Sequence, residues 1–243
     1  MNTFFLLLAG HAIGDFVFQT TQSVKTKKRL GLKAGRFWHH TLGHGLLTAI
    51  ALLLAGMSWA AVWAGGAAIV VIHSAIDAMK LAVDRRLEPD SPWRFWAYVL
   101  DQTLHAASLF ALAQWLEPWQ LPALHYGAAW LALTLLATRG IGFGIDLYLA
   151  RFQLNTIEDG QGLQRAGFQI GLMERLLVVG FVLMDLPAGV GFLLAAKSIF
   201  RFGDLQRAES RALTEYVLMG TLLSIGGAFL LASLFKTWTE SIS

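Results

Sequence analysis

The sequence has no cysteine, and charged residues make up only 14% of its 243 residues. The absence of cysteine excludes disulfide bonds and thiolate metal ligands. Soluble globular domains contain about 25% charged residues, so this chain is unusually poor in charge. Hydrophobic residues reach 56%, and the mean hydropathy is +0.54. We therefore predict an all-α, polytopic membrane protein and not a soluble domain.

The signature motifs of several enzyme classes are also missing. The chain has no GxSxG, HExxH or CxxC sequence, and the glycine-rich stretch at 140–145 lacks the strand–turn–helix context of a phosphate loop. The basic stretch KTKKRLGLKAGR at 25–36 is better explained by membrane topology and contact with anionic lipid than by nucleic-acid binding. We expect membrane lipids, and no nucleic acid, among the partners.

Eight apolar stretches approach the roughly 20 residues that a helix needs to cross a bilayer. They lie at 2–19, 38–56, 60–82, 94–115, 122–138, 167–184, 187–202 and 214–235. Lysine and arginine concentrate in every second connection, beginning with the one between the first two stretches. Because basic connections stay in the cytoplasm, this pattern predicts that both termini face outward.

Residues 139–166 interrupt the apolar pattern, because they are rich in glycine and polar residues. We interpret them as an interfacial or re-entrant helix followed by a cytoplasmic loop. The expected organisation is a four-span membrane domain rich in His and Asp at 1–116, followed by a second membrane region of about four spans at 117–243.

Six of the seven histidines fall in the first four apolar stretches, and each stretch carries one pair of polar residues spaced i, i+4. That spacing places both side chains of a pair on one helix face. The pairs are His11 and Asp15, His40 and His44, His73 and Asp77, and Asp101 and His105. His39 lies off the face shared by His40 and His44.

The order of residues within the pairs predicts two layers in the bundle, one helical turn or roughly 6 Å apart. The fourth stretch runs opposite to the third, and its aspartate precedes its histidine, so both aspartates fall at the same depth. The deeper layer consists of His11, His44, His73 and His105. The layer nearer the cytoplasm consists of Asp15, His40, Asp77 and Asp101.

These eight residues form a candidate metal site. Ionisable side chains at membrane depth are costly and normally face a bundle interior or water. Imidazole and carboxylate ligands suit zinc first, with manganese and iron as alternatives, and helix bundles build such sites from facing helices. One or two ions would fit, with at least one aspartate orienting a histidine. A proton or ion path and a structural polar network remain alternatives.

A second set of polar residues falls in the last three apolar stretches. Arg175, Lys197 and Arg201 are candidates for holding an anionic group such as a lipid phosphate. The structural alternative is ion pairing of Glu174 with Lys197 and of Arg201 with Glu215.

Four segments carry a family resemblance: HAIGDFVFQ at 11–19, HTLGH at 40–44, HSAIDAMK at 73–80 and DQTLH at 101–105. They resemble the bacterial membrane family DUF3307, whose function is unknown, and GLMERLLVVG, GFLLAAKSIFRF and TEYVLMGTLLS resemble its longer members. The resemblance implies a multi-pass protein of the bacterial inner membrane. The H-x-x-x-D pattern is also similar to inner-membrane proteins labelled metal-dependent hydrolases.

The first functional hypothesis is an intramembrane metal-dependent hydrolase acting on a lipid or phosphoester from the cytoplasmic side. The metal would activate water, and Asp15, Asp77 or Asp101 would act as general base. The alternatives are a metal-ion or proton transporter, a di-iron membrane oxidoreductase, and a non-catalytic membrane sensor or assembly factor. The pattern of residues leaves the oligomeric state open.

Overall fold

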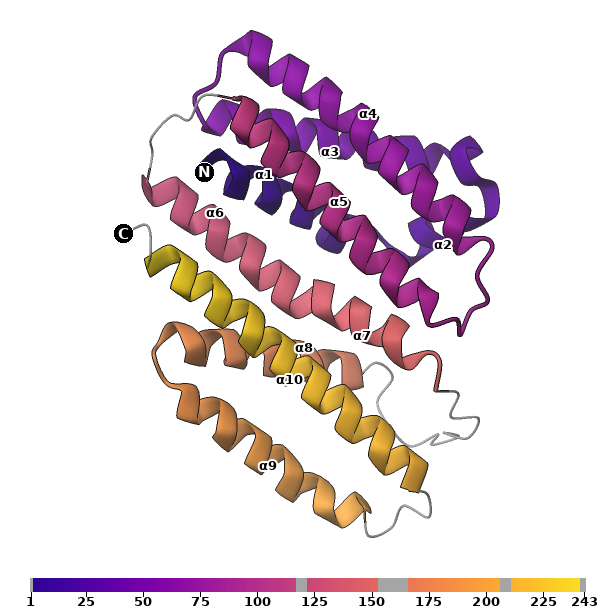
Figure 1. Ribbon diagram of the computed structural model, residues 1–243, viewed down its shortest axis with the longest axis vertical. Helices are drawn as coiled ribbons and strands as arrows, with labels where there is room; N and C mark the ends of the chain where they lie inside the picture. The colour runs from indigo at the N-terminus through magenta and orange to yellow at the C-terminus, as the bar shows by residue number, and fades with distance from the viewer. Residues whose placement is uncertain (1, 117–121, 153–165, 206–210, 241–243) are drawn as a thin grey trace. The chain divides into compact units, whose positions relative to one another are not determined.

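A computed structural model describes residues 2–116, 122–152, 166–205 and 211–240, and all regular elements in these ranges are helical (Figure 1). This confirms the predicted all-α class. The chain forms two compact units, Met1–Leu135 and Leu136–Ser243. The boundary between the units thus falls about 19 residues after the division expected at 116/117.

In the described part of the first unit, eight helical segments follow one another along the chain. They are α1 (Asn2–Ile13), the π-helix η1 (Gly14–Phe18), α2 (Thr21–Leu30), the 3₁₀-helix η2 (Gly31–Lys33), α3 (Gly35–Leu54), α4 (Trp59–Asp84), α5 (Trp93–Trp115) and α6 (Pro122–Leu135). The second unit contains the π-helix η3 (Leu136–Gly140), α7 (Ile141–Leu149), α8 (Ala166–Leu183), α9 (Pro187–Leu205) and α10 (Arg211–Glu240).

Three helical stretches in the described ranges are long and apolar enough to cross a membrane, namely 59–84, 126–149 and 214–240. A fourth is added if the bent pair 3–18 and 21–33 counts as one span. The eight predicted spans are therefore not confirmed. In α4 only 28% of the most apolar window is buried, so most of its apolar surface faces outward, as in a helix that contacts lipid.

The stretch at 126–149 runs through α6, η3 and α7. Residues 139–149, which we expected to form an interfacial segment, thus belong to an element long enough to span a membrane. Most of the loop expected at 150–166 lies outside the described residues.

The basic stretch at 25–36 is largely helical, and the chain bends by 88° where it enters this stretch from α1 and η1. Thr20 caps the new helix α2, because its side chain accepts a hydrogen bond of 3.2 Å from the backbone N–H of Ser23. Gly31 ends the helix at a φ of +64°, a conformation that favours glycine. As a result, α2 turns back against α3 and α4, and its Lys27 side chain is buried.

Each main helix of the first unit has an apolar half and a polar half. Leu7, Leu52, Ile69 and Leu112, from α1, α3, α4 and α5, belong to one buried apolar cluster. The His and Asp pairs lie in the other half of the same four helices. Because neighbouring helices alternate in direction, the polar halves meet at one end of the bundle, and the apolar core closes the other end.

Close packing of α3 against α4 depends on two facing glycines. A Cβ atom at Gly66 would lie 3.1 Å from the backbone oxygen of Gly45, and a Cβ at Gly45 would lie 3.1 Å from the backbone oxygen of Gly66. Small residues let membrane helices approach closely, so these two positions set the distance between the helices.

In the second unit, α8 packs against α9 and α10, and α10 also contacts α7 and η3. Val178, Val190, Ile225 and Ala228 form its buried apolar cluster.

We expect Gly66→Leu to destabilise the protein, because the added side chain meets backbone that cannot move aside. The cost should be about 1–3 kcal/mol, as in other overpacked cores, and would appear as a lower melting temperature of the detergent-solubilised protein. Gly127→Leu is the matched control, since a Cβ at Gly127 meets nothing within 4 Å. Equal melting temperatures for the two variants would contradict the proposed role of the Gly45–Gly66 contact.

Candidate metal centre

All eight predicted residues of the first unit lie in one connected cluster. In the deeper layer, the ring centroids of His44 and His73 are 3.8 Å apart and those of His73 and His105 are 4.2 Å apart. His11 lies 4.9 Å from His105 and 5.1 Å from His44 between ring centroids. These four imidazoles are buried, with exposed fractions of 2–5%.

The second layer is joined through carboxylates. Oδ1 of Asp15 lies 3.3 Å from Nε2 of His40, and Oδ2 of Asp77 lies 3.7 Å from the same nitrogen. The side-chain amide of Gln102 donates to Asp15 at 3.0 Å and to Asp101 at 3.1 Å. The structure therefore brings the eight residues together, and the group Asp15, His40, His44 and His73 combines members of both predicted layers.

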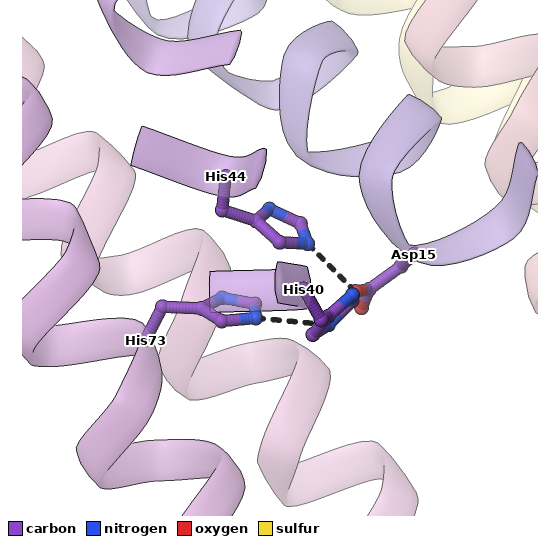
Figure 2. A group of neighbouring side chains, drawn as sticks. All are labelled: Asp15, His40, His44 and His73. Carbon is purple, nitrogen blue, oxygen red and sulfur yellow. Dashed lines mark hydrogen bonds and ion pairs between the residues drawn. The ribbon is translucent and has the colours of Figure 1, made fainter. Parts of the chain in front are cut away.

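Four of these residues lie close enough together to hold a metal ion, and Figure 2 shows their side chains converging. Asp15, His40, His44 and His73 each offer one ligand atom, and these atoms all lie within 4.8 Å of one another. Oδ1 of Asp15 is 3.1 Å from Nε2 of His44, and Nε2 of His40 is 3.2 Å from Nε2 of His73. A zinc ion with ligands at about 2.0–2.1 Å would hold them about 3.3 Å apart. The existing spacing needs little adjustment to accept the ion.

A second group of possible ligands consists of His73, Asp77 and His105. It shares His73 with the first group. Neither ring nitrogen of His105 has a hydrogen-bond partner among the described residues, although the ring is buried. Such a group is normally costly, so His105 remains available for a second ion or a bound molecule.

Local backbone structure positions the ligand Asp15. It lies in the π-helix η1, in which the wider turn rotates its carboxylate relative to a regular α-helix. Gly14 precedes it and packs against the ring of His44, where a Cβ atom would come within 2.4 Å of the imidazole. The π-turn and the glycine together allow α1 to approach α3 at the site.

Two cations that the sequence pattern did not predict belong to this cluster. Lys27, on α2, donates to Asp77 at 2.9 Å. Lys80, on α4, lies 3.4 Å from Oδ2 of Asp101. Lys80 comes three residues after Asp77 on one helix, and this spacing could have predicted that Lys80 lies on the same helix face as the cluster. Lys27 gave no such signal, because only the bend before α2 brings it into the bundle.

Two cavities meet at Lys80 and Asp101. A polar cavity of about 60 Å³ is lined by Asp15, Asp77 and Asp101 together with Lys27 and Lys80. A larger apolar pocket of about 420 Å³ lies along α4 and α5. Its lining includes Ile76, Met79, Trp93, Trp96, Leu100, Lys80 and Asp101. The Lys80–Asp101 ion pair thus separates the polar cluster from an apolar pocket.

The three cations predicted in the last part of the chain have different surroundings. Lys197 pairs with Glu174 at 2.7 Å, as the structural alternative expected. Arg175 is buried, with an exposed fraction of 4%, and donates to the backbone oxygen of Thr138 and to Ser224. Arg201 lies in α9, but its side chain falls outside the described residues, so the expected pair with Glu215 stays a prediction.

Fold and site together define an α-helical protein with membrane-type apolar helices and a buried cluster of His and Asp that can hold a metal ion. The chain belongs to the family DUF3307, described as a protein of unknown function, whose model matches residues 3–130. The match covers the whole cluster and ends within α6.

A curated relative is NADH-quinone oxidoreductase subunit N of Laribacter hongkongensis, which is 32% identical to this chain over 110 residues. That alignment covers 44% of the chain but only 21% of the relative. No solved structure matches the chain.

We expect the purified protein to bind about one zinc ion per chain, and His44→Ala to weaken binding by more than about 100-fold. Mutating a residue that orients a ligand lowers metal affinity by about 10–100-fold. Removing the ligand itself should lower the affinity at least as much. Mass spectrometry of metal content in folded, detergent-purified protein measures this. His39→Ala is the control, because His39 is exposed and is not part of the ligand groups. Equal zinc content in the two variants would exclude His44 as a ligand.

Gly14→Ala should weaken zinc binding by about tenfold without unfolding the protein, because the new methyl group displaces the His44 ring and not the backbone. Gly43→Ala makes the same chemical change where a Cβ meets nothing within 4 Å. Zinc titration of both variants tests this, with their melting temperatures as a check on folding. The role of Gly14 would be disproved by equal zinc affinities.

Proposed function

We propose that the protein is an intramembrane metal-dependent hydrolase that acts on a phosphoester carried by an amphiphile. The observation that supports this best is the position of Lys80 and Asp101, which line both the polar cavity at the metal ligands and the apolar pocket along α4 and α5. An amphiphile has the same division between a charged head and an apolar tail. The apolar pocket suits the tail, and the polar cavity suits the head.

The four-residue group of Asp15, His40, His44 and His73 would hold the ion. Zinc bound there supplies an activated water and polarises the scissile phosphoester. Two lysines of the polar cavity, Lys27 and Lys80, bind the phosphate oxygens, because ammonium groups are good partners for phosphate. In this proposal the cations that hold the substrate come from the first unit.

Asp101 is the best-placed general base. Its Oδ1 atom is buried without a hydrogen-bond partner in the described structure, whereas Oδ2 is held by Lys80 and Gln102. Asp101 accepts a proton as the water oxygen bonds to phosphorus. It returns the proton to the alcohol oxygen when the bond between phosphorus and that oxygen breaks. Asp15 serves as a ligand, and Asp77 is occupied by Lys27.

We place the protein in the bacterial inner membrane as a multi-pass protein, with both termini outward. Helix α2 supports this orientation, because Lys25, Lys28 and Arg29 on it are exposed beside the polar end of the bundle. Basic residues at this end favour the anionic cytoplasmic leaflet. The substrate would then enter from that leaflet.

Zinc-loaded protein should hydrolyse a fluorescent phosphatidic acid in mixed micelles, and Asp101→Asn should lower kcat by about 10²–10⁴-fold, the usual contribution of a general base. Zinc content should not change. Asp84→Asn is the matched control, since Asp84 lines the same polar cavity but pairs with Lys28 and belongs to neither ligand group. Absence of turnover with this lipid and with bis(p-nitrophenyl) phosphate would refute the hydrolase proposal.

A proton path is the second candidate, favoured by a chain of polar contacts through the cluster. Lys27 contacts Asp77, Asp77 contacts His40 and His73, and His40 and His73 share a hydrogen bond of 3.2 Å. If this candidate holds, proteoliposomes with a pH-sensitive dye will show proton flux in metal-free protein. The flux will then fall in Asp77→Asn and be unchanged in Asp84→Asn.

A further inference from the structure

The second unit contains a cavity of about 710 Å³ bounded by residues of α7, α8, α9 and α10. Apolar side chains, among them Ile145, Phe168 and Leu193, form much of its wall. Four side chains in the same wall are charged, two acidic and two basic: Asp146, Glu174, Arg175 and Lys197. Their pairing determines which ligand charges the cavity can accept.

Two of these four charges neutralise each other. Nζ of Lys197 lies 2.7 Å from Oε2 of Glu174, and the Glu174 side chain is buried. A buried carboxylate bonded to an ammonium group contributes little net field to the cavity. The Glu174–Lys197 pair is therefore part of the wall, and the remaining pair of charges decides binding.

Arg175 has no direct ion-pair partner among the described residues. Its Nε donates to the backbone oxygen of Thr138 and its Nη1 to the hydroxyl of Ser224, each at 2.8 Å, and both acceptors are neutral. Nη2 has no hydrogen-bond partner in the described ranges. It lies against Gly142, where a Cβ atom would come within 2.7 Å of it. A guanidinium that is 96% buried and fixed in this way is well placed to bind an anion.

Asp146, in the same cavity, also has no direct partner for its carboxylate among the described residues. It forms no hydrogen bond or ion pair with another described residue, although the charge of Arg175 attracts it. A purely anionic ligand on Arg175 would be repelled by this carboxylate. A ligand that also carries a cation would satisfy both groups.

We propose that this cavity binds one zwitterionic phosphoester amphiphile, a lipid of the phosphoethanolamine class. The phosphate bonds to Nη2 of Arg175, the ammonium group pairs with Asp146, and an acyl chain covers the apolar wall. Lys197 keeps its pair with Glu174 in this proposal, so Arg175 provides the direct contact with the phosphate. The site involves only residues of the second unit and does not depend on the metal centre.

Binding of dioleoyl phosphatidylethanolamine to the full-length protein in detergent, measured by native mass spectrometry, tests the proposal. The wild type should bind it about fivefold more tightly than dioleoyl phosphatidylglycerol, which lacks the ammonium group. Asp146→Asn should abolish this preference, and Arg175→Gln should weaken both lipids by about 30-fold. Arg151→Gln is the control, because Arg151 packs over the ring of Tyr148 and does not line the cavity.

Several results would overturn the proposal. One is an unchanged preference between the two lipids in Asp146→Asn, which keeps the experiment decisive even if the buried Arg175→Gln variant does not fold. Equal weakening in Arg151→Gln would show that general surface charge is responsible. Binding of inorganic phosphate with no retained lipid would show that the cavity accepts a soluble phosphate and not an amphiphile.

Discussion

The first unit depends on the cost of burying ionisable side chains in an apolar helix bundle. The carboxylate of Asp15 lies within 3.4 Å of nitrogens of His11, His40 and His44. One anion thus makes polar contacts with three imidazoles from two helices. Lys27 and Lys80 neutralise the other two aspartates of the cluster. Without these mutual contacts, each group would carry a desolvation penalty of several kcal/mol. Sliding one of the four helices along its neighbours would break these contacts, so the cluster fixes the register of the helices.

Irregular backbone appears where each unit places its polar groups. The π-helix η1 carries the ligand Asp15, and the π-helix η3 contains Thr138, whose carbonyl oxygen accepts from the buried Arg175. A π-turn breaks the regular hydrogen-bond pattern of the helix, and this leaves backbone oxygens available to side chains. Glycines complete the arrangement, because Gly14 admits the ring of His44 and Gly142 admits the guanidinium of Arg175.

The two units differ in where their charged side chains lie relative to their pockets. In the first, the Lys80–Asp101 pair stands between a polar cavity and an apolar pocket. In the second, Arg175 and Asp146 line a single cavity whose other charges cancel. In each unit, one pocket is thus lined by charged and apolar side chains together.

The all-α class, the membrane character and the four His and Asp pairs follow from the sequence alone, because composition and i, i+4 spacing are local properties. The reversed order of Asp101 and His105 was enough to predict two layers. Tertiary structure alone decided that Asp15, His40, His44 and His73 form the tightest group, since ligand distances depend on helix rotation and on the π-turn at Gly14–Phe18. It also brought Lys27 to Asp77 through the 88° bend and paired Lys197 with Glu174. Such contacts join residues far apart in the chain, and no local pattern encodes the helix positions that create them.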